Sequence, residues 1–321
     1  MKTNFLTIAI PNYNRHESLL EQLRRLLPQI VDKDIYLIII DNYSITPVAD
    51  FLSEKIILPK NVRIYRNNSN IGIDRNILEC LVKTETDWVW TLSDGDFIKE
   101  NAVEKIYKFI IENYDSVFIN LCGHDLESKG FTEFCERFIY WGLFSVSHTI
   151  FNVRKLKAYL STYEKYVSTH NGQLFVLLKY LEDRPNDKCI FNDLDVHQTA
   201  PLPTWSKAAF VNDTTHTLNL LNSEFIAYKR IIKKTVNYKI VNQCLGHLCN
   251  ARAYEGLNLR NYLVLFSKLV PFFYYKNFLG ARFFLFIAVI FNPRIYRWAR
   301  VKSGKKEYEL SNASKTLRWD Y

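Results

Sequence analysis

Two aspartates separated by one glycine follow an apolar run of the chain. Asp94-Gly95-Asp96 follows WVWTL, residues 88–92, with Ser93 between them. Carboxylate oxygens are the ligands that Mg²⁺ and Mn²⁺ prefer, and such ions keep open positions for the oxygens of a diphosphate. The glycine lets the backbone turn tightly and lets a large ligand approach. An isolated Asp-Gly-Asp is usually a plain turn, so its interpretation depends on its context.

Asp41 stands in the same position after another apolar run, IYLIII, at residues 35–40. A carboxylate there can accept hydrogen bonds from a nucleobase N–H or a ribose hydroxyl, as acidic residues do in other nucleotide-binding sheets. Aspartate is also a common N-cap of a helix. The residue alone does not separate a binding role from a capping role.

Two further polar segments can contact a nucleotide. Pro11, Tyr13 and Asn14 belong to the turn PNYN after the run FLTIAI, and the backbone and the Tyr13 ring can flank a nucleobase. Arg75 lies in NIGIDRN, where a guanidinium at the start of a helix can bind a diphosphate through forked donors. The simpler interpretations are a strand-to-helix turn and a solvated helix start.

These clusters lie between alternating strand-like and helix-like segments in the first 120 residues. Strands are predicted at residues 5–10, 35–40, 61–66 and 87–92, and helices at 17–27, 70–82 and 101–111. Apolar strands separated by amphipathic helices predict a parallel sheet covered on both faces. Ligands bind such sheets beyond the carboxyl ends of the strands. The polar clusters all follow strands, so we expect them at that edge.

Composition excludes several classes of protein. The 321 residues are 48% hydrophobic, which excludes wholesale disorder. The net charge is +9, and residues 257–321 hold 12 Lys and Arg against 3 Asp and Glu, so the preceding 256 residues are balanced. This distribution disfavours a nucleic-acid binder. Six cysteines without a CxxC pair and an N-terminus without a secretory signal favour a reducing, cytoplasmic setting.

Four segments in order resemble one known family. IAIPNYNR, LIIIDNYS, NNSNIGIDRN and WVWTLSDGDFI resemble the nucleotide-sugar-binding half of family 2 glycosyltransferases, over about residues 5–120. The resemblance implies the GT-A fold, an α/β, Rossmann-like architecture with a mostly parallel central sheet. It also implies transfer of a sugar from a nucleotide-diphosphate sugar with inversion, as in enzymes that build bacterial O-antigens and capsules.

The resemblance assigns roles position by position. It implies that the Pro11–Asn14 turn borders the nucleobase and that Asp41 binds the base or the ribose. Arg75 is expected near the diphosphate. Asp94 is expected near the donor ribose or sugar, and Asp96 as a ligand of Mn²⁺ or Mg²⁺, with Asp94 as a second candidate ligand.

The general base is the main departure from the family. Its members often carry a Glu-Asp pair at a helix start in the second half, whereas the corresponding residues here, 168–173, read STHNGQ. His170 is the candidate base, because imidazole suits proton transfer near neutral pH; the alternative is a capping or surface histidine. Other candidate bases are Asp125, Glu127, Asp193 and Asp195. Two roles are open for His197: a neighbour of the phosphates or of the metal, or a structural histidine. Tyr43 stands where the family usually has a small residue.

The chain is expected to contain two regions. Residues 1–215 are predicted as the catalytic domain, with 1–120 for the nucleotide sugar and 121–215 for the acceptor, and 216–321 as a helical region with a basic, aromatic tail. The apolar run 278–291 is shorter than the roughly 20 residues that span a bilayer. Aromatics with Lys and Arg suit the membrane surface, although a packed helix with a solvated tail is the alternative.

The predicted function is metal-dependent transfer of a sugar to a hydroxyl of a lipid-linked bacterial surface glycan. The expected location is peripheral, on the inner face of the plasma membrane. Two alternatives remain open. A nucleotidyltransferase would usually carry a Gly-rich, basic loop after the first strand, which IAIPNYNR lacks. A non-catalytic membrane-associated scaffold would keep the fold without binding nucleotides.

Overall fold

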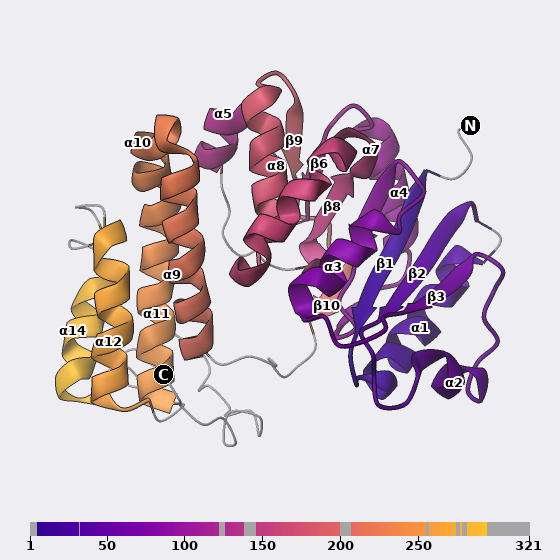
Figure 1. Ribbon diagram of the computed structural model, residues 1–321, viewed down its shortest axis with the longest axis horizontal. Coiled ribbons are helices and arrows are strands. Elements are labelled where there is room, and N and C mark those ends of the chain that lie inside the picture. The colour runs from indigo at the N-terminus through magenta and orange to yellow at the C-terminus, as the bar shows by residue number, and fades with distance from the viewer. Residues whose placement is uncertain are drawn as a thin grey trace. The chain divides into compact units, whose positions relative to one another are not determined.

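The computed structural model describes residues 5–31, 33–121, 126–137, 146–199, 207–254, 257–273, 277 and 281–293 (Figure 1). The chain divides into two compact units, Met1–Ala200 and Pro201–Tyr321. The boundary that we expected near residue 215 lies inside the first helix of the second unit, α9 (Lys207–Glu224). The division of the first unit into donor and acceptor halves stays a prediction.

An eight-stranded mixed sheet forms the centre of the first unit, in the order β3-β2-β1-β4-β8-β6-β9-β7. Its strands are β1 (Leu6–Asn12), β2 (Ile35–Asp41), β3 (Val62–Arg66), β4 (Trp88–Thr91), β6 (Phe118–Asn120), β7 (Leu126–Lys129), β8 (Thr149–Asn152) and β9 (Lys188–Phe191). Strands β1 to β4 pair in parallel, as do β6 and β9, whereas β8 and β7 pair antiparallel to their neighbours. The predicted mostly parallel α/β sheet is confirmed.

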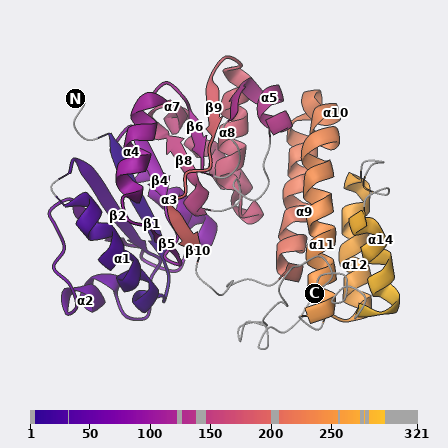
Figure 2. The same ribbon diagram turned by 180° about the vertical axis from the view of Figure 1, so that it is seen from behind.

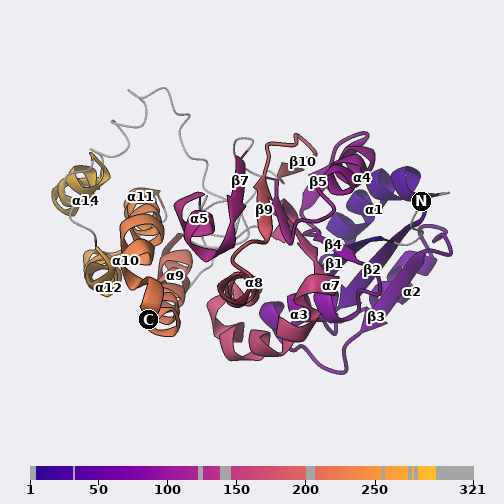
Figure 3. The same cartoon turned by 90° about the horizontal axis from the view of Figure 1, so that it is seen from above.

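Helices cover both faces of this sheet. They are α1 (His16–Ile30), α2 (Val48–Ser53), α3 (Ile73–Val82), α4 (Ala102–Glu112), α5 (Gly130–Arg137), α7 (Val153–Leu156) and α8 (Gly172–Asp183), with 3₁₀ segments η1 (Val146–His148) and η2 (Lys157–Thr169). Seen from above, α1 and α4 lie on one face and α3 and α8 on the other (Figure 3). The strands are apolar on both sides for this reason, and Trp88 and Trp90 are fully buried.

The first strand is longer than the sequence predicts. Pairing of β1 with β2 continues through Pro11 to Asn12, so Pro11 is buried within the strand and does not begin the turn. The pairing of β1 with β4 ends at Ala9. At Pro11, β1 therefore has a neighbouring strand on one side only. A residue without an N–H is tolerated at such a position.

A second, two-stranded sheet holds the end of the predicted metal-binding segment. Strand β5 (Asp96–Ile98) pairs antiparallel with β10 (His197–Thr199), so that Asp96 lies opposite Thr199. Residues 138–152 (FIYWGLFSVSHTIFN) also have a strand-like, aromatic sequence; the structure places Thr149–Asn152 of them in a strand, β8, and residues 138–145 lie outside the described part of the chain.

The second unit is helical. It contains α9, a 3₁₀ turn (Ile226–Tyr228), α10 (Lys229–Ile232), a π-helical turn (Lys233–Asn237), α11 (Tyr238–Tyr254), α12 (Leu259–Leu269), a 3₁₀ turn (Val270–Phe272) and α14 (Ala281–Phe291) (Figure 2). Tyr262 of α12 stacks on Phe286 of α14, with ring centroids 4.8 Å apart, and donates a hydrogen bond to the Phe286 carbonyl. Within the described residues, every helix is too short or too polar to cross a membrane.

Candidate functional site

The polar clusters predicted at the strand ends do meet at one edge of the sheet. Asn12 ends β1 beside Asp41, which ends β2. The Asn12 side chain donates to Asp94 Oδ2 at 2.8 Å across the loop that follows β4. The parallel register explains this, because parallel strands place their carboxyl ends at the same edge.

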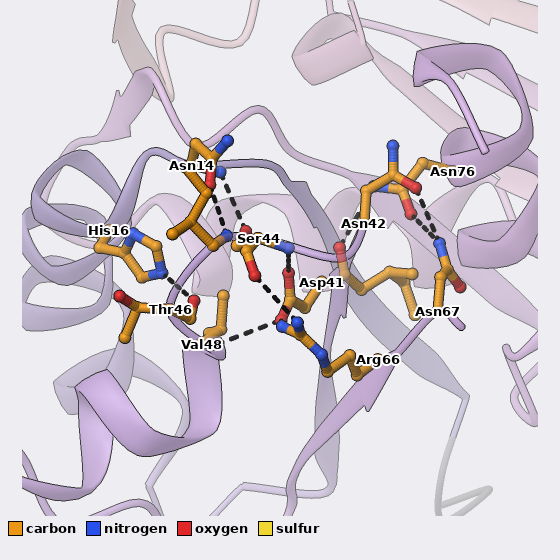
Figure 4. A network of polar contacts seen from close by, with 12 residues as sticks. Asn14, His16, Asp41, Asn42, Ser44, Thr46, Val48, Arg66, Asn67 and Asn76 are labelled. Atoms are coloured by element: carbon orange, nitrogen blue, oxygen red, sulfur yellow. Dashed lines mark hydrogen bonds and ion pairs between the residues drawn. The ribbon is translucent and has the colours of Figure 1, made fainter. Parts of the chain in front are cut away.

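Asp41 is buried at this edge, and both of its oxygens have partners within the protein (Figure 4). Oδ1 accepts from the Ser44 N–H at 2.8 Å, and Oδ2 accepts from the Val48 N–H at 3.2 Å and from Arg66. Burial by itself raises the pKa of the Asp41 carboxyl, but the hydrogen bonds from Ser44, Val48 and Arg66 outweigh it and hold the pKa below its ordinary value. Asp41 is not the N-cap residue of α2, which is Pro47, but its carboxylate accepts the N–H of Val48, the first residue of that helix.

The loops after β1 and β2 are joined to each other. Asn14 donates its N–H to Ser44 Oγ at 2.9 Å and accepts from the Ile45 N–H at 2.8 Å. Asn14 and Tyr43 both adopt left-handed backbone conformations, at φ 53° and 66°, which cost energy for residues other than glycine. The two hydrogen bonds between the loops compensate for that cost. Tyr13 and Tyr43 remain 44% and 51% exposed, and the Arg66 guanidinium lies over the Tyr43 ring.

An asparagine cluster, defined here as Asn42, Asn67, Asn70 and Asn76, ties the end of β2 to the start of α3 (Figure 4). Asn42 donates to Asn70 at 2.8 Å and accepts from Asn67 at 3.0 Å, and Asn67 also donates to Asn76. The sequence did not predict that these residues form a unit. The only signal was the repetition of asparagine in NNSNIGIDRN.

Asp94 and Asp96 lie in very different surroundings. Asp94 is almost fully buried, and Arg15 Nη1 lies 2.7 Å from its Oδ1. Burial raises the pKa of the Asp94 carboxyl to about 6, against the opposing influence of Arg15 and Asn12. Asp96 is partly exposed, and its Oδ2 accepts from Ser147 Oγ at 2.7 Å.

Ser147 and Arg15 belong to the site although no motif in the sequence predicted them. Ser147 Oγ accepts the Ser93 N–H at 2.9 Å as well as binding Asp96, so it fixes the loop on both sides of Asp94. No pattern around Ser147 pointed to this role, because the contact joins segments far apart in the chain. Arg15 stood at the end of IAIPNYNR without a visible partner.

The two aspartates differ in how many of their oxygens are already engaged by the protein. Both Asp94 oxygens are engaged by Asn12 and Arg15, whereas Asp96 uses one oxygen for Ser147. In the part of the chain that the structure describes, His, Cys, Asp and Glu side chains form no group of three that could hold a metal. Among the described residues, Asp96 therefore has one carboxylate oxygen without a hydrogen-bond or ion-pair partner, whereas each Asp94 oxygen already has a partner, and the metal-ligand roles of both stay predictions. Any ion bound here would take further oxygens from a ligand or water.

His170 lies against a carboxylate that was not among the predicted site residues. Its Nδ1 lies 3.1 Å from Oδ2 of Asp74, a buried residue in the first turn of α3. His170 has a left-handed backbone, at φ 55°, where η2 ends before α8. A carboxylate beside Nδ1 can fix the orientation and the tautomer of an imidazole.

Arg75 is exposed and pairs with Glu164 of η2 at 3.2 Å. Its predicted contact with a diphosphate stays a prediction. Glu127 pairs with Lys188 at 3.1 Å, and Asp195 pairs with Lys99. Asp193 is exposed, whereas Asp125 and the side chain of His197 lie outside what the structure describes.

Comparison with known proteins identifies the region that carries this site. The family model for glycosyl transferase family 2 matches residues 7–158. No curated protein sequence matches the chain. The solved structure of S. aureus TarS 1-349 has 15% sequence identity and a TM-score of 0.57, with coverage of 96% of this chain and 95% of that one.

Two other solved structures have the same fold. A longer TarS structure has a TM-score of 0.56 at 14% identity, and the alignment covers 96% of this chain but only 56% of that chain. The mannosyltransferase PcManGT from Pyrobaculum calidifontis, in complex with GDP-Man and Mn²⁺, has a TM-score of 0.52 at 12% identity, with coverage of 91% and 88%. Residues 7–158, which contain the four family segments, match glycosyl transferase family 2, and the chain has the GT-A fold.

Proposed function

We propose that this enzyme transfers a sugar from a nucleotide-diphosphate donor to a hydroxyl of a lipid-linked bacterial surface glycan, with inversion. The observation that carries the proposal is the edge of the sheet where exposed Tyr13 and Tyr43, partly exposed Asp96 and Arg15 gather. TarS 1-349 has been solved with UDP, and PcManGT with GDP-Man and Mn²⁺, which supports this class of donor.

The donor side of the site follows from the contacts described above. The Tyr13 and Tyr43 rings provide aromatic faces for a nucleobase, on loops that Asn14 and Ser44 hold together. Asp96 is oriented by Ser147, so its remaining oxygen can hold Mn²⁺ or Mg²⁺. When bound, the ion neutralises charge on the departing diphosphate.

The acceptor side uses His170 and Asp74. His170 Nε2 takes the proton of the acceptor hydroxyl as that oxygen attacks the anomeric carbon, and the bond from that carbon to the diphosphate breaks. Asp74 holds Nδ1–H and stabilises the imidazolium that forms. A single displacement of this kind inverts the anomeric centre.

A thermal-shift panel tests the donor proposal. UDP, GDP, CDP and dTDP are each tested with and without Mn²⁺ on the wild type, on Asp96→Asn and on Asp34→Asn, an exposed aspartate before β2 that controls for the change in charge. At 100 times its dissociation constant, a ligand adds about 2.7 kcal/mol of stability. We expect one nucleotide class to raise the unfolding temperature of all three proteins. Mn²⁺ should increase this rise in the wild type and in Asp34→Asn but not in Asp96→Asn.

The same panel separates the alternatives. A scaffold without nucleotide binding would show no shift with any of the four diphosphates, and that result would overturn the proposal. Product analysis distinguishes a nucleotidyltransferase, which forms a new bond to the α-phosphate and so does not release a nucleoside diphosphate. Release of the diphosphate in step with glycan formation is the expected result.

The proposal of a lipid-linked acceptor depends on residues of the second unit. Helix α12 carries the exposed apolar residues Leu259, Leu263 and Val264, and the region from residue 257 onwards holds the excess positive charge. Apolar side chains beside Lys and Arg bind an anionic bilayer surface. We expect the full chain to sediment with phosphatidylglycerol vesicles and not with phosphatidylcholine vesicles. Leu263→Glu should weaken this binding and Asn219→Glu, on α9, should not; equal effects would contradict the proposed surface.

A further inference from the structure

Arg15 pairs with Asp94, the residue that the sequence offered as a second candidate metal ligand. Arg15 immediately precedes α1, and its Nη1 lies 2.7 Å from Asp94 Oδ1. The other Asp94 oxygen accepts from Asn12. The Arg15 side chain is 36% exposed while that of Asp94 is 6% exposed, so the guanidinium lies between a buried carboxylate and solvent.

Gly95 provides the space for this guanidinium. A Cβ added at Gly95 would lie 2.6 Å from Arg15 Nη2 and 3.3 Å from Nη1. The backbone of Gly95 is outside the left-handed region that favours glycine, so the turn does not require a glycine. The glycine of the Asp-Gly-Asp segment therefore lets Arg15 lie against the loop that carries Asp96.

Among the described residues, the guanidinium of Arg15 uses only part of its hydrogen-bonding capacity. It has five N–H donors, and the contact with Asp94 engages Nη1. Arg15 is also two residues from Tyr13, whose exposed ring is at the proposed nucleobase site. A cation with further donors, in contact with Asp94 and Gly95 on the loop that leads to Asp96, fits a diphosphate, because phosphate oxygens accept forked N–H donors.

We propose that Arg15 binds the diphosphate of the donor directly, and that Asp94 is a positioning residue for Arg15 and not a metal ligand. This inference rests on the proposed function. Arg15 then supplies a positive charge, belonging to the protein itself, where negative charge develops on the leaving group. It follows that part of the affinity for a nucleoside diphosphate persists without a divalent metal.

Isothermal titration calorimetry tests this with the full chain in EDTA and then in Mn²⁺. The probes are UDP, GDP, CDP and dTDP together with the four matching nucleosides. In EDTA, Arg15→Gln should weaken binding of the preferred diphosphate by about tenfold or more, since hydrogen bonds to charged groups are the strong ones. Binding of the nucleoside should not change, because it lacks the phosphates.

Three more variants separate a ligand contact from a structural one. Gly95→Ala keeps every charge but displaces the guanidinium, so it should lower diphosphate affinity in the same direction as Arg15→Gln. Arg15→Lys should keep part of that affinity, because the charge remains and the fork is lost. Arg24→Gln, an exposed arginine on α1, removes the same charge and should have no effect. Thermal unfolding without ligand confirms that each variant is folded.

The outcomes distinguish this inference from the proposed function. Absence of nucleotide binding by the wild type in both conditions would overturn both. Binding in Mn²⁺ but not in EDTA would overturn the role of Arg15 and leave the proposed function standing. An Arg15→Gln protein that binds the diphosphate as the wild type does, or that loses the nucleoside equally, would show a structural ion pair only.

Discussion

His170 and Asp74 meet although one ends η2 and the other begins α3. Nδ1 of the imidazole lies 3.1 Å from the buried Asp74 carboxylate, and Oδ1 of that carboxylate has no hydrogen-bond partner among the described residues. A buried carboxylate oxygen without a partner is costly. The other oxygen of Asp74 is the one that lies against His170. The carboxylate that orients the candidate base therefore comes from a segment far away in the sequence.

Loss of His170 should abolish proton transfer and spare donor binding. We expect His170→Ala to lower kcat by roughly 10²- to 10⁴-fold, the usual contribution of a general base. The affinity for the nucleoside diphosphate should not change. Asp74→Asn should lower kcat and also shift the acid limb of the pH profile, because an amide does not stabilise the imidazolium. A pH profile that does not move in Asp74→Asn would refute the orienting role.

Arg75 should matter for the ligand more than for the fold. Its ion pair with Glu164 is exposed on both sides, and such pairs contribute about 0–1 kcal/mol to the free energy of unfolding. If Arg75 contacts the diphosphate as expected, Arg75→Gln lowers affinity for the nucleoside diphosphate while urea unfolding barely changes. Glu164→Gln is the matched control, since it breaks the same pair and leaves the arginine. Equal affinities in both variants and the wild type would exclude the contact.

Asp41 should contribute to acid stability. The Asp41 carboxyl has a pKa below its ordinary value of 3.8, so the folded state favours its charged form. Its stabilising contribution is therefore present above that ordinary value and is lost as the pH falls through the lower folded value. Urea unfolding between pH 7 and pH 3 should show this loss in the wild type and in Asp34→Asn. Asp41→Asn should be less stable at neutral pH and lack that part of the pH dependence.

Tyr43 should be replaceable without loss of folding. Its left-handed backbone disfavours a side chain, whereas its ring lies over Arg66 with 4.8 Å between the guanidinium carbon and the ring centroid. Strain relief and loss of the cation–π contact are each about 1 kcal/mol, so Tyr43→Gly should unfold at nearly the same urea concentration. Nucleotide affinity should fall, because one aromatic face is lost. Unchanged affinity would remove Tyr43 from the donor site.

The sequence predicted the helices and strands and the edge of the sheet at which the polar clusters meet. It did not predict which side chains contact one another across the site. Apolar runs and helical spacing were sufficient for β1 to β4, α1, α3 and α4, because each pattern is local. The predicted end of β1 at residue 10 was wrong, because pairing with β2 extends the strand through Pro11. Contacts such as Asn12 with Asp94 and Ser147 with Asp96 depend on the folded arrangement, and no spacing in the chain encodes them.

The asparagine cluster consists of carboxamides, which neither gain nor lose a proton over the range in which enzymes are assayed. The link between the end of β2 and the helix that carries Asp74 is therefore electrically neutral at every such pH. Acid or base that alters the charge of neighbouring groups leaves this link in place. The asparagine cluster therefore adds no titrating group of its own to a pH–rate profile of this enzyme.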